Sequence, residues 1–208
     1  MIDFHTFLAF FTTSLLLALS PGPDNLFVLA QSLQNGRAAG FYVTLGLSTG
    51  LIAHTVAVAL GLAAIIRASL VAFAVLKFMG AAYLIYLAWQ AFSAGSSDGG
   101  ADALPLLSRS GLYRRGVVMN LTNPKVSLFF MAFLPQFADP MRGSMTVQFF
   151  QLGGIFIIAT MIVFGAVSIF AGGAGERFRR SAMAQLVVNR AAAAVFVGLA
   201  FKLALSER

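Results

Sequence analysis

Long apolar runs alternate with short polar segments along the whole chain. Six of these runs have the length of about 20 residues that a helix needs to cross the hydrocarbon core of a membrane. They cover residues 4–34, 40–66, 70–92, 113–137, 146–171 and 184–205. The segment 93–112 is rich in Gly, Ser and Asp, which is typical of a flexible linker. It divides the chain into two halves with three runs each.

The composition agrees with this pattern and excludes a soluble globular protein. Hydrophobic residues make up 59% of the 208 residues and charged residues 10%, with a mean hydropathy of +0.87. That leaves too little polar surface to cover a water-exposed fold. The chain has no Cys, which excludes disulfides and thiolate metal sites. The net charge of +7 comes mostly from basic residues in the gaps between runs, so no basic face for nucleic acid is expected.

The first apolar run is interrupted by Pro21, Gly22 and Pro23. Each proline removes a backbone donor and clashes with the preceding turn, and glycine adds backbone freedom, so one continuous helix is disfavoured. Pro23 suits the first position of a new helix, and Asp24 and Asn25 then fall in its first turn. The pattern therefore predicts two helix segments joined at a break.

The fourth run carries a matching interruption. Asn123 is a favoured N-cap residue, Pro124 suits the first helical position, and Lys125 follows in the first turn. Identical residues flank the two breaks in one register: Leu19 and Leu121, Leu26 and Leu128, Phe27 and Phe129, and Ala30 and Ala132. Paired interrupted segments in two halves of a membrane protein are typical of a transporter with its site between the halves.

An odd number of helices in each half makes the second half enter the membrane from the opposite side. We therefore predict an all-α integral membrane protein with six transmembrane helices. The helices form two inverted-topology repeats, residues 1–92 and 113–208, joined by the linker 93–112, and the first and fourth are interrupted.

The positions of the basic residues predict the orientation, because Lys and Arg are enriched in cytoplasmic loops. The gaps after the first, third and fifth runs hold Arg37, Arg109, Arg114, Arg115, Arg177, Arg179 and Arg180. The opposite face holds Arg67, Arg142 and Arg208. We expect the first set of loops, with the linker, in the cytoplasm and both termini outside.

Asp24 and Lys125 bring opposite charges to nearly equivalent positions in the two halves. Each lies beside a helix N-terminus, whose free N–H groups and positive dipole end attract an anion. A zwitterionic amino acid has matching chemistry: its carboxylate can take Lys125 or the N–H groups, and its ammonium can take Asp24. The predicted substrate site comprises Pro21, Gly22, Pro23, Asp24, Asn25, Asn123, Pro124 and Lys125. The alternatives are a purely structural ion pair that locks the two halves together, or first-turn charges that reach the membrane interface.

His54 is a candidate proton carrier, together with Asp24. It lies four residues after Gly50 and eight after Gly46, hence on the same helix face. Histidine changes charge within the physiological pH range, and ionisable side chains inside membranes often belong to proton relays. The alternative is a histidine that only packs between helices. The glycines themselves indicate close helix packing, as does the small-residue spacing of Ala194 and Gly198.

Several other polar motifs have structural interpretations. Residues 46–50 match the G-x-S-x-G pattern of hydrolases, which requires a strand and a sharp turn rather than an apolar helix. Residues 120–122 match a glycosylation acceptor but lie within a span. Asn120, Gln136, Gln148 and Gln151 are expected to bridge helices by hydrogen bonds. Two His without Cys predict neither a zinc site nor any other resident cofactor.

In combination, the motifs resemble those of the LysE/RhtB family of amino-acid exporters. The resemblance rests on residues 21–25 and 123–125, the glycine-rich second run with His54, and residues 77–84 and 134–137. It implies a six-helix exporter in the bacterial inner membrane, driven by the proton gradient and working as a homodimer without a cofactor. Some members carry an acidic residue at the position of His54.

We therefore predict a secondary transporter that exports a small, neutral amino acid in exchange for protons. Three alternatives remain. A metal-cation exporter of the same broad superfamily would carry several intramembrane carboxylates, and Asp24 is the one found here. A membrane-embedded enzyme would need a convergent nucleophile, base and acid, and an assembly subunit without transport would leave the two breaks unexplained.

Overall fold

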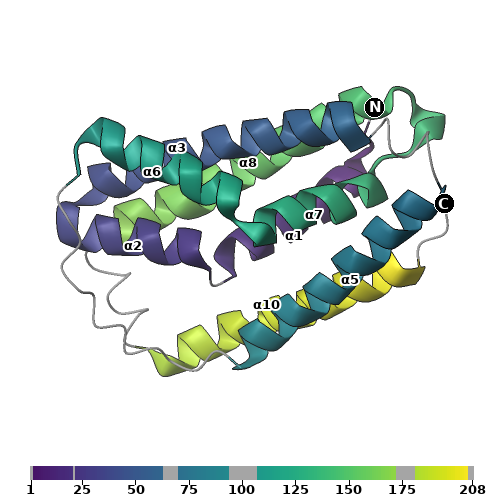
Figure 1. Ribbon diagram of the computed structural model, residues 1–208. Helices are drawn as coiled ribbons and strands as arrows, with labels where there is room; N and C mark the ends of the chain where they lie inside the picture. Colours follow the sequence, from purple (N-terminus) through teal and green to yellow (C-terminus); the bar gives the residue numbers. More distant parts are fainter. Residues whose placement is uncertain (1, 21, 63–69, 94–106, 172–180, 206–208) are drawn as a thin grey trace.

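The computed structural model describes residues 2–20, 22–62, 70–93, 107–171 and 181–205. These residues form eight α-helices and contain no β-strand. The helices run roughly along the long axis of the molecule, so that both termini lie at one end (Figure 1). The predicted site residue Pro21 lies outside the described residues, as do residues 94–106 of the linker and Arg67, Arg177, Arg179, Arg180 and Arg208.

The first predicted span consists of α1 (Phe4–Leu19) and α2 (Pro23–Asn35), which meet at an angle of 62°. The Asp3 side chain caps α1 by accepting a hydrogen bond from the Thr6 amide at 2.7 Å. The second segment begins at Pro23 with Gly22 as its N-cap, which confirms the predicted helix start.

The fourth predicted span consists of α6 (Arg109–Thr122) and α7 (Pro124–Phe133), with a 3-10 helix at Leu134–Phe137, and bends by 52°. Asn123 is the N-cap of α7, as predicted. The predicted start of this span, residue 113, was too late, because the Ser108 side chain caps the helix and Arg109 begins it. The segments before the two breaks therefore have similar lengths, 16 residues in α1 and 14 in α6.

The remaining runs form single helices. They are α3 (Arg37–Ala57), which continues as a π-helix at Val58–Leu62, α5 (Leu70–Ser93), α8 (Met145–Phe170) and α10 (Ala182–Leu205). Within the described residues three helices are long and apolar enough to cross a membrane, or five if each bent pair counts as one span. The chain is thus a multi-pass membrane protein, and α5, the third predicted span, is not among these candidates.

Close helix packing positions the second broken span against α3. A Cβ atom on Gly46 would lie 2.1 Å from the Tyr113 carbonyl oxygen, and one on Gly116 would lie 2.4 Å from that of Val43. Only glycine permits this approach, which agrees with the packing predicted for Gly46. Gly198 instead faces open space, because no atom of the described residues lies within 4 Å of such a Cβ.

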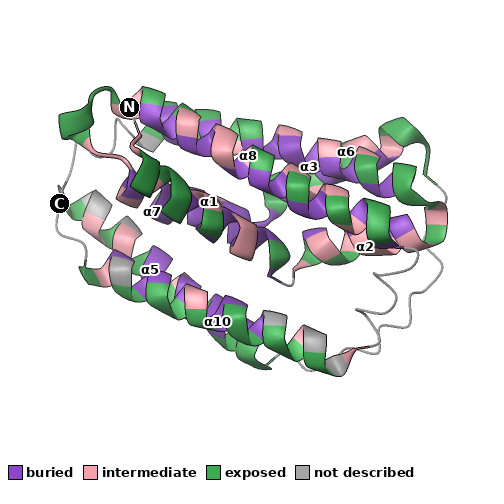
Figure 2. Ribbon diagram, turned by 180° about the vertical axis from the view of Figure 1, so that it is seen from behind, coloured by how far each residue is buried: buried purple, intermediate pink, exposed green. Residues whose placement is uncertain are grey.

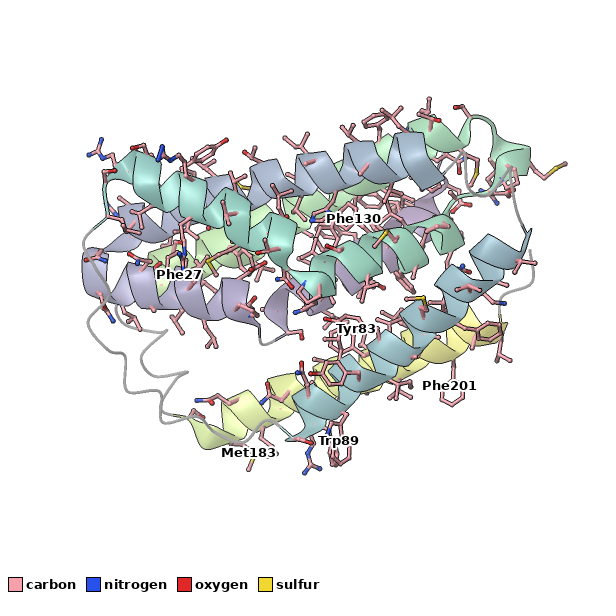
Figure 3. All side chains as sticks on the ribbon, in the orientation of Figure 1. Phe27, Tyr83, Trp89, Phe130, Met183 and Phe201 are labelled. Atoms are coloured by element: carbon pink, nitrogen blue, oxygen red, sulfur yellow. The ribbon has the colours of Figure 1, made fainter. Side chains whose placement is uncertain are left out.

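The outer faces of the helices are apolar. Buried residues follow the inner faces and exposed residues the outer faces of the bundle, most clearly on α5 and α10 (Figure 2). Three side chains of this outer face, Trp89, Met183 and Phe201, are 67%, 69% and 61% exposed and point away from the bundle (Figure 3). Large apolar side chains in such positions are expected to contact lipid.

Candidate functional site

The two helix breaks lie side by side, and residues from one contact residues from the other. The Asn123 Nδ2 atom donates a hydrogen bond to Asp24 Oδ2 at 2.9 Å. The Lys125 ammonium donates to the main-chain oxygen of Ser20 at 3.0 Å. The broken helices run in opposite directions along the molecule, α1–α2 away from the end with the termini and α6–α7 toward it (Figure 1). The repeat of the sequence motif thus brings two distant segments together.

The first break supplies an acidic group with unused hydrogen-bonding capacity. Asp24 is 6% exposed, and its Oδ1 atom has no hydrogen-bond partner. Gly22 provides no side chain to cap α2. Asn25, a predicted site residue, donates from Nδ2 to the Ala18 carbonyl at 2.7 Å and so stabilises the bend between α1 and α2.

The second break supplies a basic group held by its neighbours. The Asn123 Oδ1 atom accepts from the Lys125 amide at 3.0 Å, so one side chain both caps α7 and binds Asp24. Lys125 is 8% exposed, and its ammonium lies 6.0 Å from the ring centre of Phe196 in α10. A Cβ atom on Gly22 would lie 3.6 Å from the same nitrogen, which places the ammonium against the first break.

Asp24 and Lys125 do not form a direct ion pair. Among the described residues, the ion pairs within 4.0 Å join Arg142 to Asp3 and Asp139. The structural alternative of a direct lock between the halves is therefore not observed. The two charges are connected instead through Asn123 and the Ser20 carbonyl. An ammonium has three donors, and a carboxylate accepts more than one hydrogen bond, so both groups retain capacity for a ligand.

A small cavity of about 30 Å³ lies between the two breaks. It is lined by Leu17, Ala18, Gly22, Asp24, Asn25, Leu51, Asn120, Asn123, Lys125, Val126, Phe156, Thr160 and Phe164. Most predicted site residues are in this set, whereas Pro23 and Pro124 begin the two helices without lining the cavity. The space suffices for about two water molecules. An amino acid therefore requires the surrounding helices to move apart.

Asn120 is a cavity residue that the sequence interpretation assigned to helix bridging. It is 2% exposed, lines the cavity, and its Oδ1 atom has no hydrogen-bond partner. The available signal was its position one helical turn before Asn123. Gln151 of α8 accepts from the Ile2 amide, next to the start of α1, whereas Gln148 binds the Asp139 amide and carbonyl in the segment before its own helix and does not bridge two helices there.

His54 lies next to the cavity rather than in its wall. The His54 Nε2 atom is 3.2 Å from the main-chain oxygen of Asn120, and the ring is half-buried, 5.8 Å from that of Phe130. The same Asn120 oxygen accepts from the Asn123 amide at 3.1 Å. His54 is therefore connected to the second break through the main chain of Asn120.

Five phenylalanines, which we call the aromatic seal, pack together beside the cavity. The seal consists of Phe10, Phe129, Phe133, Phe137 and Phe156. Phe156 lines the cavity, and its ring centre is 5.4 Å from that of Phe129. From there the contacts continue through Phe133 to Phe137, at 4.9 Å in each step. Phe137 lines a second hollow of about 310 Å³, which also contains His5 and Arg142.

The model of the LysE type translocator family matches residues 15–207, which include both breaks. The chain belongs to the LysE family. It is therefore a transporter and not an enzyme, and the G-x-S-x-G pattern of residues 46–50 lies in the middle of α3, as expected for a packing motif.

Relatives within the LysE family include proteins of several bacteria. The chain is 32% identical to a membrane protein of Vibrio cholerae over 99% of this chain and 100% of the relative. It is 37% identical to a homoserine/homoserine lactone efflux protein of Salmonella typhi, over 78% of each chain. It is 31% identical to a leucine efflux protein of Salmonella choleraesuis, over 67% of this chain and 66% of the relative. No solved structure matches the chain.

Proposed function

We propose that this LysE family member exports a small, neutral amino acid across the bacterial inner membrane in exchange for protons. The relatives named as homoserine and leucine efflux proteins support an amino acid as the substrate. One observation carries the proposal: an unsatisfied Asp24 oxygen and the Lys125 ammonium lie at the same buried cavity.

The two charges suit the two poles of a zwitterion. Burying a carboxylate and an ammonium is costly unless each has a charged or hydrogen-bonding partner. A substrate carboxylate can accept from Lys125 and from the free N–H groups at the start of α2, where Gly22 leaves the helix without a side-chain cap. The substrate ammonium can donate to the unpaired Oδ1 of Asp24.

The walls of the cavity favour a neutral side chain on the substrate. Six of the thirteen lining residues have apolar side chains: Leu17, Ala18, Leu51, Val126, Phe156 and Phe164. Asp24 and Lys125 are the charged members of the described lining, and the proposal assigns both to the α-amino and α-carboxylate groups. No charge remains there to pair with an acidic or basic substrate side chain, which would therefore be buried uncompensated.

Transport requires the cavity to open alternately toward each side of the membrane. A cavity with room for about two water molecules is too small for any amino acid, so the structure represents a closed state of the transporter. The aromatic seal separates it from the end with the termini, so release in that direction requires these rings to part. Rocking of the two halves about a central site is the usual device in transporters built from inverted repeats.

The proton carrier in this proposal is His54 or Asp24. Asp24 binds the substrate directly, so its protonation would compete with the substrate ammonium. His54 would act through Asn120, whose main chain it contacts next to the cap of α7. Both routes couple proton uptake to the same cavity.

The proposal also covers how the chain is arranged in the membrane. Six spans, with α5 as the third, form two inverted repeats around the cavity. Arg37, Arg109, Arg114 and Arg115 lie at or near the starts of α3 and α6 and face the cytoplasm, while the termini lie outside. Two copies of the chain form a homodimer in the lipid bilayer.

Everted membrane vesicles test the function, because export becomes uptake in that orientation. Vesicles containing the protein are expected to accumulate one or a few neutral amino acids when the interior is acidified, and an ionophore that dissipates the proton gradient should abolish this uptake. A panel of radiolabelled amino acids identifies the substrate. Equal uptake with and without the pH gradient would contradict proton exchange, and no uptake of any amino acid would contradict the function.

A further inference from the structure

We propose that the Asn120 amide oxygen and Asp24 Oδ1 together bind the substrate ammonium, so that Asn120 selects amino acids over analogues without an amino group. This inference rests on the proposed function and adds to it a specificity-determining residue.

The hydrogen bonds around Asn120 distinguish its main chain from its side chain. The main-chain oxygen accepts from the Asn123 amide and contacts His54, as described above. The side-chain Oδ1 is buried at the cavity and has no hydrogen-bond partner. An asparagine that served only to bridge helices would have this oxygen bonded, because an unpaired buried acceptor is unfavourable.

Gly50 of α3 makes room for the Asn120 side chain. A Cβ atom at Gly50 would lie 2.6 Å from Asn120 Oδ1, 2.7 Å from its Cβ and 2.9 Å from its Cγ. Such distances are too short for any other residue type without a shift of the asparagine. The Tyr113 hydroxyl donates to Thr49 Oγ1 at 2.9 Å between the same two helices, at a position outside the cavity lining. Gly50 is thus a positioning residue for the Asn120 amide.

The two unpaired atoms match the chemistry of an ammonium group. Both are oxygens that only accept hydrogen bonds, and one of them is charged. The Asn120 side chain also hydrogen-bonds that of Asp24, so the two side chains are held together at the same cavity. An ammonium supplies three donors and a positive charge. A hydroxyl in the same position supplies one donor and no charge, so it would leave an acceptor unsatisfied. A site built to bind a polar group strongly rejects an analogue that lacks it.

The test uses the purified full chain in proteoliposomes and the best amino acid from the panel. Competition by the unlabelled amino acid and by the 2-hydroxy acid with the same side chain measures the preference for an ammonium. Asn120→Leu is expected to raise KM for the amino acid and to reduce this preference about tenfold. Asn120→Asp keeps an oxygen acceptor and is expected to retain the preference, which separates ammonium binding from a folding defect.

Thr49→Val is the matched control, because it removes a hydrogen bond between α3 and α6 away from the cavity. This variant should keep the wild-type preference. If Asn120→Leu also keeps this preference, the inference is wrong. Failure of the wild-type protein to transport any amino acid would instead contradict the proposed function.

Discussion

The two helix breaks have the same backbone design and opposite chemistry. In both, a proline occupies the first helical position and a charged residue follows in the first turn. The first break has no side-chain cap, and Asp24 keeps an unpaired oxygen. The second is capped by Asn123, and Lys125 already donates to the Ser20 carbonyl of the first break.

This difference shows how a repeated element can bind an asymmetric ligand. The repeat supplies two helix starts that meet in the interior. The divergence of a single side chain in each copy gives the cavity one acidic and one basic pole. Two acidic copies would suit a cation and two basic copies an anion, whereas the mixed pair suits a zwitterion.

Removing the charge of the second break is expected to have the largest effect. Lys125→Ala takes away the cation of the cavity and leaves Asp24 buried without compensation, so uptake into everted vesicles should fall by about 100-fold or more. Lys77→Ala is the matched control, because Lys77 also belongs to an apolar helix but its ammonium lies 5.0 Å from the Phe78 ring centre, outside the cavity lining. Equal transport by the two variants, at equal amounts in the membrane, would contradict the site.

Removing the cap of the second break should have an intermediate effect. Asn123→Ala and Ser108→Ala each delete an N-cap, of α7 and α6 respectively. Each is expected to lower the free energy of unfolding by about 0.5–2 kcal/mol. Only Asn123→Ala also loses a hydrogen bond to Asp24, so it alone should reduce transport, by about tenfold. Thermal unfolding in detergent and vesicle uptake measure both quantities, and a parallel loss of transport in both variants would remove the special role of Asn123.

The smallest effect is expected at His54, which is connected to the second break only through the main chain of Asn120. His54→Gln should still transport at a fixed pH, but the dependence of uptake on pH should become flatter. His5→Gln, in the hollow beyond the aromatic seal, serves as the control and should keep the wild-type profile. If His54→Gln keeps that profile too, the proton carrier is Asp24.

The sequence predicted those features that depend on local chemistry. Prolines and an asparagine cap determine where α2 and α7 begin. The length of each apolar run predicts a helix. The face shared by Gly46, Gly50 and His54 was also predictable, because all three follow one row along α3, against α6.

Features that depend on tertiary packing could not be predicted. A polar Ser108 and several arginines hide the true start of α6, which lies four residues before the predicted residue 113. The sequence does not reveal that Asp24 and Lys125 bind Asn123 and Ser20 rather than each other. The same holds for Asn120, because helical periodicity alone does not show which polar side chain of a buried helix remains unpaired.

The most direct test of the two-pole site is a crossed competition experiment. Purified Asp24→Asn and Lys125→Met are compared with the wild type in binding the amino acid, its methyl ester and its 2-hydroxy acid. The account predicts that Lys125→Met no longer distinguishes the ester from the amino acid but still rejects the hydroxy acid, and that Asp24→Asn shows the reverse. If both variants weaken all three ligands by the same factor, the two breaks do not act as separate poles of a zwitterion site.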